Sequence, residues 1–169
     1  MDSSIRQGTV NDLAASVGLW NEAQSARRGV ASVYPGMLEL VRTRFAARNA
    51  ILLIAEELGE VIGFAQVCPA GENDGAGQVI PGLAHIGAVS VKPGCWGRGF
   101  GRRLMTAVIE EMPRRGYTRA QLWTQKTNDR ALRLYTDLGF VFTGDEKTDD
   151  EMGERIGRYI LAATPRSDA

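Results

Sequence analysis

The chain has 169 residues, 44% of them hydrophobic, and its 20 Lys and Arg balance its 20 Asp and Glu, which is ordinary for a single globular domain over 1–169. A lone histidine, His85, excludes a multi-histidine metal site, and two cysteines, Cys68 and Cys95, cannot form a disulfide framework. No apolar run is long enough to cross a bilayer and residues 1–10 lack a signal-peptide pattern, so we expect a cytoplasmic protein with neither a metal nor a membrane partner.

Hydrophobic spacing and turn residues predict strands and helices in the order β-α-α-β-β-β-α-β-α-β-β. The predicted strands are 5–8, 51–58, 60–68, 83–93, 119–125, 140–144 and 155–161. The predicted helices start at a capping box in 9–12 and fade at 25–29, cover 37–45, run from about residue 98 to Pro113, and cover 128–138. A Gly-rich loop over 69–78 and a frayed tail at 164–169 complete the chain.

These elements predict an α/β (α+β) fold. Strands 51–58 and 60–68 form a hairpin, and 83–93, its helix and 119–125 form a βαβ unit with parallel outer strands. We therefore expect a mixed, mostly antiparallel sheet of about seven strands, with about four helices distributed over both faces.

Positive charge is concentrated in the middle of the chain. Residues 92–133 carry ten Lys and Arg against three Asp and Glu. Such a block is either a solvated helix face or a site for a small polyanion. Nucleic acid is not an expected partner, because the chain as a whole is neutral.

The sharpest local feature is the glycine run Trp96-Gly97-Arg98-Gly99-Phe100-Gly101, between a predicted strand and a predicted helix. Glycines let the backbone turn tightly, and a helix N-terminus offers free N–H groups to a phosphate. No Gly-Lys-Ser/Thr follows, so the run is not a P-loop, and its spacing does not match a dinucleotide fingerprint. A strand-to-helix turn that needs glycine only for its shape is the alternative.

The stretch 89–105 resembles the acetyl-CoA loop of the GNAT (GCN5-related) N-acetyltransferases. Val91 and Pro93 match its V-x-P, and Gly99 and Gly101 match its glycine positions. Trp96 departs from the Arg or Gln usual there, which affects only that side chain, because the family holds the pyrophosphate through backbone N–H groups.

The stretch 122–140 resembles the second signature of the same family. The matching residues are Leu122, Asn128, Ala131, Tyr135, Gly139 and Phe140, while Thr124 replaces an aliphatic residue. The resemblance covers essentially the whole chain and implies the GNAT fold.

The resemblance also implies acetyl-CoA as co-substrate and assigns residues to it. The implied contacts are Val89, Ser90 and Val91 on the strand, Gly97, Arg98, Gly99, Phe100, Gly101 and Arg102 at the turn, and Asn128 and Tyr135. Tyr135 would be the acid that protonates the leaving thiolate. Because it lies in a stripe of apolar residues, it could instead be a residue of the hydrophobic core. Asn128 is also placed to cap a helix.

The sequence does not decide which group is the base that takes the proton of the amine. His85 shares strand parity with Val89 and is one candidate. Glu56 and Glu57, which alternation sends to opposite faces, and a bound water are the others. Cys95 precedes a helix N-terminus, where a thiol becomes more reactive, but a covalent acetyl-cysteine is not the habit of the family.

The predicted function is an N-acetyltransferase that moves the acetyl group directly to a primary amine of a small molecule in a ternary complex. We expect segments 25–36 and 69–82 to select the acceptor. A protein N-terminus or lysine is the second candidate for the acceptor, and a non-catalytic acyl-CoA sensor is the alternative of another class. A homodimer is expected from the habit of the family.

Overall fold

The computed structural model describes residues 2–150 and 152–162, so the expected frayed tail lies outside the described residues. The strands are β1 (Ser3–Gln7), β2 (Ile51–Glu57), β3 (Glu60–Gly71), β4 (Val79–Val91), β5 (Arg119–Gln125), β6 (Val141–Thr148) and β7 (Arg155–Ala162). The helices are α1 (Leu13–Arg28), α2 (Met37–Phe45), α3 (Phe100–Glu111) and α4 (Asp129–Asp137), with short 3-10 turns at Val10–Asp12, Pro93–Cys95 and Met112–Arg115.

The hydrogen-bonded strands follow the order β1-β2-β3-β4-β5-β7-β6. The hairpin of β2 and β3 and the parallel pairing of β4 with β5 are both present. The mixed, mostly antiparallel sheet with four helices is therefore confirmed. Among the described helices, none is both long and apolar enough to cross a membrane.

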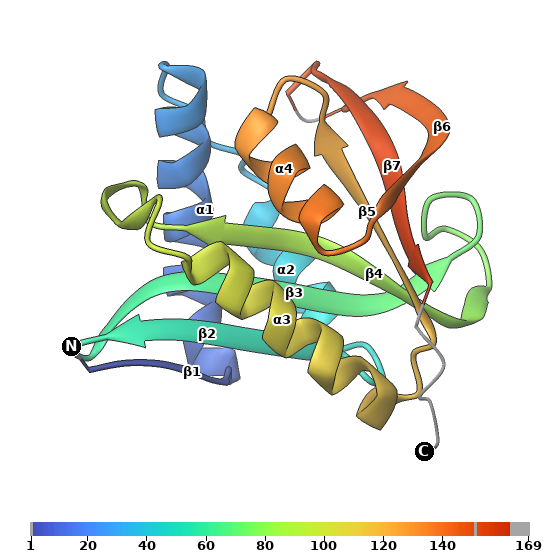
Figure 1. The fold of residues 1–169 in the computed structure, drawn as a ribbon, viewed down its shortest axis with the longest axis horizontal. Coiled ribbons are helices and arrows are strands. Elements are labelled where there is room, and N and C mark those ends of the chain that lie inside the picture. The colour runs from blue at the N-terminus through green and yellow to red at the C-terminus, as the bar shows by residue number, and fades with distance from the viewer. Residues whose placement is uncertain (1, 151, 163–169) are drawn as a thin grey trace. The chain divides into compact units, whose positions relative to one another are not determined.

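The chain divides into two compact units, and the first comprises residues 2–68 and 86–115. Figure 1 shows α3 on one side of β2 and β3, with α1 and α2 on the other side. All side chains from Ile51 to Ala55 of β2 are buried, as expected for a strand that is covered on both faces. Val41 of α2 and Leu104 of α3 are fully buried in the two layers.

The start of α1 matches its sequence signal. Thr9 and Asp12 form a capping box, in which the Thr9 N–H donates to Asp12 Oδ2 at 2.8 Å. Arg6 of β1 donates to Asp12 at 2.8 Å and to Glu56 of β2 at 2.5 Å. The guanidinium lowers the pKa of the Asp12 carboxyl to about 2. The ion pairs tie the first helical turn to the edge of the sheet.

The second unit comprises residues 69–85 and 116–162, with residue 151 outside the described part. In it, β5, β7 and β6 pair antiparallel, and Leu83–His85 of β4 pair in parallel with Arg119–Gln121 of β5. The expected loop over 69–78 is shorter than predicted, because β3 continues to Gly71, and the next strand, β4, begins at Val79 rather than at residue 83. Strand pairing overrides the weak strand propensity of this Gly-rich segment.

Candidate active site

The connection from β4 to α3 is a turn that glycines shape. Gly97 and Gly99 have φ values of 78° and 86°, a region that L side chains rarely adopt. A Cβ built on either residue would meet nothing within 4 Å. Both glycines are therefore needed for the backbone conformation, and the turn faces open space at these positions.

Trp96 has a structural role in this turn that the sequence did not reveal. Its indole Nε1 donates to the carbonyl oxygen of Val91 at 2.8 Å. This contact closes the turn between the last residue of β4 and the first glycine. At the position where the family usually has Arg or Gln, this chain thus has a Trp whose indole stabilises the turn.

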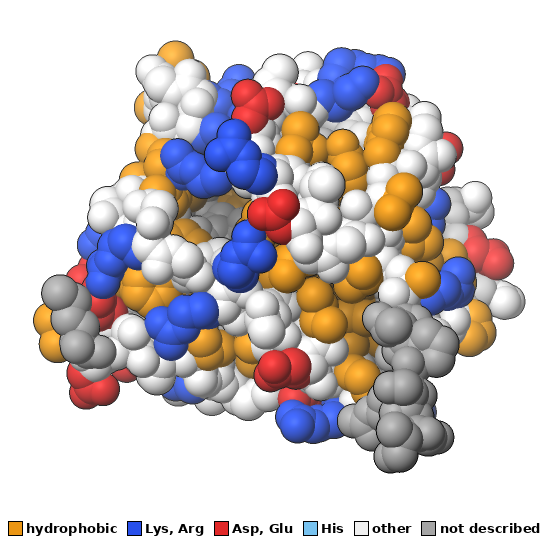
Figure 2. All heavy atoms as spheres, in the orientation of Figure 1, with side chains coloured by type: hydrophobic (Ala, Val, Ile, Leu, Met, Phe, Trp, Pro, Cys, Tyr) orange, Lys and Arg blue, Asp and Glu red, His pale blue; other side chains and the backbone are white. Residues whose placement is uncertain are grey.

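The N-terminus of α3 has the properties of an anion site. Its N-cap is Gly99, which gives no side-chain cap, and no acidic residue lies in the first turn. The first N–H groups of a helix carry a partial positive charge and point outward. Figure 2 shows Lys and Arg side chains over this end of α3. A phosphate group is the ligand that such an arrangement favours.

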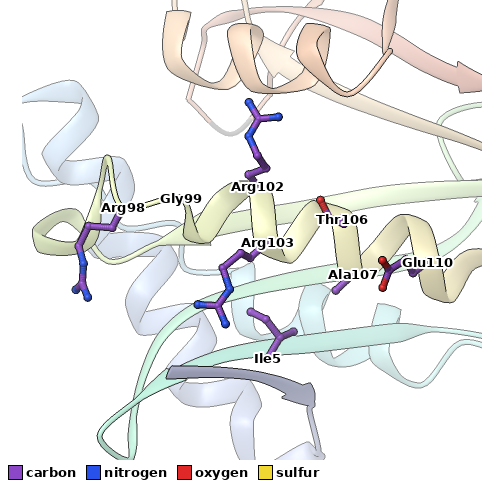
Figure 3. A pocket seen from close by; sticks show the side chains of 8 residues that line it. All are labelled: Ile5, Arg98, Gly99, Arg102, Arg103, Thr106, Ala107 and Glu110. Atoms are coloured by element: carbon purple, nitrogen blue, oxygen red, sulfur yellow. The ribbon is translucent and has the colours of Figure 1, made fainter. Parts of the chain in front are cut away.

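A shallow, open depression of about 530 Å³ lies beside this helix, within the first unit. Its lining residues are Ile5, Arg98, Gly99, Arg102, Arg103, Thr106, Ala107 and Glu110. Figure 3 shows that Arg103 points toward β1 and that Arg102 points to the other side of α3. Arg103 donates to Ser3 Oγ at 2.9 Å. The three arginines therefore surround the helix end on different sides.

Arg98 is held in place by a carboxylate. Its two terminal nitrogens donate to the two oxygens of Glu57 at 2.6 and 3.0 Å. This pairing lowers the pKa of Glu57, which makes its carboxylate a weaker base. Since Glu56 binds Arg6, both glutamates that competed as the base are engaged in ion pairs.

Cys95 lies under the same turn. Its side chain is buried, and its Sγ lies 3.8 Å from Arg98 Nη1. A nucleophilic thiol needs an open path to its substrate, so burial disfavours a covalent acetyl-cysteine.

On β4, the residues assigned to acetyl-CoA alternate in exposure. Ser90 is buried, whereas Val89 and Val91 are half-buried. A Cβ at Gly63 of β3 would contact both Leu104 of α3 and the Ser90 carbonyl oxygen, each at 3.1 Å. From Ala84 to Val91 the even-numbered residues are buried and the odd-numbered ones half-buried, so the second set is the one that a ligand could reach.

His85 lies in the second unit and forms part of a hydrogen-bonded chain. Its Nδ1 lies 3.3 Å from Gln121 Nε2, and Gln121 Oε1 accepts from Arg158 Nε at 2.9 Å. Because the Arg158 guanidinium only donates, the Gln121 amide nitrogen must face the imidazole and donate to it. A neutral His85 then carries its proton on Nε2. Sequence reasoning missed this chain, since no local signal links residues on three strands.

Asn128 and Tyr135 lie on α4 in the second unit. Asn128 is the N-cap, and its Oδ1 accepts from the Ala131 N–H at 3.3 Å. Tyr135 is buried, which raises its pKa to about 12, and its ring centroid lies 5.8 Å from that of Phe140. The expectations that Asn128 caps the helix and that Tyr135 occupies a core position are thus confirmed.

The strand order, the glycine turn before α3 and the uncapped N-terminus of that helix are typical of an acyl-CoA-dependent acyltransferase. A model described as "Acetyltransferase (GNAT) family" matches residues 18–140. The chain belongs to this family and is an acetyl-CoA-dependent N-acetyltransferase, as the two signatures in its sequence indicated.

Individual proteins agree with this assignment. The chain is 29% identical to the uncharacterized N-acetyltransferase YhfO of Bacillus subtilis, over 81% of this chain and 89% of that protein. It is 26% identical to the L-methionine sulfoximine/L-methionine sulfone acetyltransferase of Pseudomonas paraeruginosa, over 95% and 91% of the two chains. The yncA structure from Salmonella typhimurium, solved with its cofactor acetyl-CoA, has a TM-score of 0.75 at 22% identity and covers 100% of this chain and 98% of its own.

Proposed function

We propose that this enzyme acetylates the primary amine of a small molecule by direct transfer from acetyl-CoA in a ternary complex. The observation that carries the proposal is the N-terminus of α3, where Gly97 and Gly99 have positive φ values and no acidic residue lies in the first helical turn. The relatives support a small acceptor, since one of them is named for amino-acid analogues.

In direct transfer, the amine nitrogen forms a bond to the thioester carbonyl carbon and loses one proton. The C–S bond breaks, and the sulfur receives one proton. Backbone groups of Val89 to Val91 are proposed to hold the thioester arm and to stabilise the charge on the carbonyl oxygen. The turn residues Gly97–Arg102 are proposed to bind the phosphates, and the Asn128 side chain is proposed to bind the pantetheine arm.

Tyr135 is proposed to donate its hydroxyl hydrogen to the sulfur of the leaving CoA thiolate. A phenol with a pKa of about 12 stays neutral at physiological pH and keeps its proton available as a donor. Among the described residues of its own unit, no group accepts from the Tyr135 hydroxyl. It therefore needs no rearrangement within that unit to donate to a thiolate.

The proton of the amine is proposed to leave by way of His85 or a water. Glu57 is the weaker alternative, because Arg98 lowers its pKa. For His85 to take the proton itself, its Nδ1 must give up Gln121 or its tautomer must change. A water oriented by the Nε2–H of His85 leaves that tautomer intact, so His85 can be catalytic in either way.

The test is release of CoA thiol from acetyl-CoA with a panel of amines, combined with calorimetric measurement of acetyl-CoA binding. The panel contains L-amino acids, polyamines, aminoglycosides, and peptides with a free N-terminus or a lysine. Turnover of small amines above the peptides supports the proposal. Turnover of peptides alone indicates a protein acetyltransferase, and tight acetyl-CoA binding without any turnover indicates a sensor. Failure to bind acetyl-CoA overturns the assignment of the turn.

We also propose, from the sequence expectations, a cytoplasmic enzyme that acts as a homodimer. Light scattering on the purified chain at several concentrations tests the second statement, and a monomer at all of them overturns it.

A further inference from the structure

An unusual arginine lies in the first unit, on the face of the sheet that α2 covers. Arg44 belongs to the last turn of α2, is half-buried, and reaches over β4, where its Nη1 lies 3.4 Å from the carbonyl oxygen of Gly87. Its charge also acts on the thiol of Cys68, a buried residue of β3. The guanidinium thus lies above two strands of the sheet.

Arg44 lacks the partner that comparable arginines of this unit have. Arg6 and Arg115, which are half-buried like Arg44, each bind a carboxylate at 3.0 Å or less. Among the described residues, Arg44 has no ion pair, and its contact with Gly87 is long for a hydrogen bond. A partly buried guanidinium without a counter-charge costs free energy that a bound anion would recover.

Residue 87 is shaped for this guanidinium. A Cβ there would lie 2.5 Å from Arg44 Nη1 and 3.0 Å from Cζ. The backbone of Gly87 does not have a positive φ, so its conformation does not require glycine. The missing side chain therefore serves to admit the Arg44 side chain to the surface of β4.

The position of this arginine matches the acceptor side of the proposed reaction. Gly87 lies two residues before Val89, on the same half-exposed face of β4. Two residues along a strand span roughly 6–7 Å, a separation suited to a group that carries an amine close to an anion. A guanidinium binds a carboxylate through two parallel hydrogen bonds.

We propose that Arg44 binds the carboxylate of the acceptor, so that the acceptors are α-amino acids or close analogues whose amine then lies next to the thioester. This inference rests on the proposed N-acetyltransferase function and adds the substrate class and the residue that selects it. Arg44 determines which acceptors bind, and the absence of a side chain at Gly87 leaves room for the Arg44 guanidinium.

The experiment compares L-methionine, L-phenylalanine and L-glutamate, each with its decarboxylated amine and its α-carboxamide. The wild-type enzyme is expected to have a kcat/KM at least ten times higher for the amino acids. In Arg44→Gln, the KM of the amino acids rises about 10- to 100-fold, which is the effect of losing a charge-assisted hydrogen bond. The KM of acetyl-CoA and the rates with the decarboxylated amines stay within about threefold of wild type.

Matched variants separate binding from folding. Arg42→Gln removes an exposed arginine of the same helix, which pairs with Glu39 at 3.3 Å, and it is expected to behave as wild type. Arg44→Lys keeps the positive charge but not the planar pair of N–H donors, and it is expected to bind the amino acids better than Arg44→Gln but less well than the wild type. Gly87→Ala places a methyl group against the guanidinium and is expected to raise the KM of the amino acids without changing any charge.

Two results would overturn the inference: Arg44→Gln lowers the rates with amino acids and decarboxylated amines equally, or the wild-type enzyme prefers amines without a carboxylate. If no amine is turned over, the proposed function fails, and calorimetry with the same amino acids and the CoA-bound protein then decides the inference. Binding that Arg44→Gln abolishes supports it, and absence of binding in the wild type rejects it.

Discussion

Replacing Tyr135 by Phe should reduce turnover without destabilising the enzyme. Tyr135 is buried and its ring packs 5.8 Å from Phe140, a contact that Phe keeps. Its hydroxyl has no partner among the described residues of its unit, so its removal strands no buried group. We therefore expect the free energy of unfolding to change by about 1 kcal/mol or less.

The pKa values indicate whether Tyr135 transfers a proton or donates a hydrogen bond, and this decides the expected size of the effect on kcat. The pKa of Tyr135 is raised to about 12 by burial, whereas a simple thiol has a pKa of about 8.5. Complete proton transfer to the thiolate is then uphill by about 5 kcal/mol. A hydrogen bond from the phenol to the developing thiolate, worth about 1.5–3 kcal/mol, is the stronger expectation, and its loss lowers kcat about 10- to 150-fold.

The assay is CoA release under saturating acetyl-CoA and the best amine of the panel, from pH 6 to pH 10. A raised pKa keeps the phenol protonated over this whole range, so the wild-type profile should show no alkaline decline caused by Tyr135. Tyr159→Phe, which removes a phenol of β7 in the same unit, is the matched control and should retain wild-type kcat. A Tyr135→Phe enzyme within twofold of wild-type kcat would refute the reasoning.

Three further predictions concern the first unit. Asp12→Asn should lower the free energy of unfolding by about 2 kcal/mol at pH 7 in urea titrations, because Arg6 lowers the carboxyl pKa to about 2. Since the folded-state pKa lies below the unfolded one, that stabilisation is complete above about pH 5 and vanishes as the pH falls from about 4 toward 2, so a constant difference would contradict it. Gly99→Val should weaken acetyl-CoA binding at least tenfold by calorimetry, because its φ of 86° is strained for a β-branched residue; unchanged affinity would remove the turn from the binding site. Glu57→Gln should keep kcat within about threefold, since the carboxylate binds Arg98 rather than serving as base, and a loss beyond a hundredfold would restore it as the base.

The sequence alone determined most of the local structure. The hydrophobic periods, the Thr9–Asp12 capping box and the glycines placed the elements in the right order, and strand β5 and helix α2 have the predicted bounds. These signals suffice because helix starts, turns and amphipathic faces depend on neighbouring residues. The glycine turn before α3 was also predicted from its composition, although the helix begins at Phe100 rather than at about residue 98.

Only the tertiary structure decided which side chains meet. Arg44 with Gly87, Glu57 with Arg98, and His85 with Gln121 join residues that lie 36 to 43 positions apart. Such contacts depend on strand register and on the packing of helices over the sheet, which no local pattern records. The sequence therefore determined the family and the glycine turn before α3. The folded chain decided that Glu56 and Glu57 are engaged in ion pairs and that the Arg44 guanidinium lies over β4 without an ion pair to any described residue. The physical reason is that burial and charge pairing arise only when distant segments pack together.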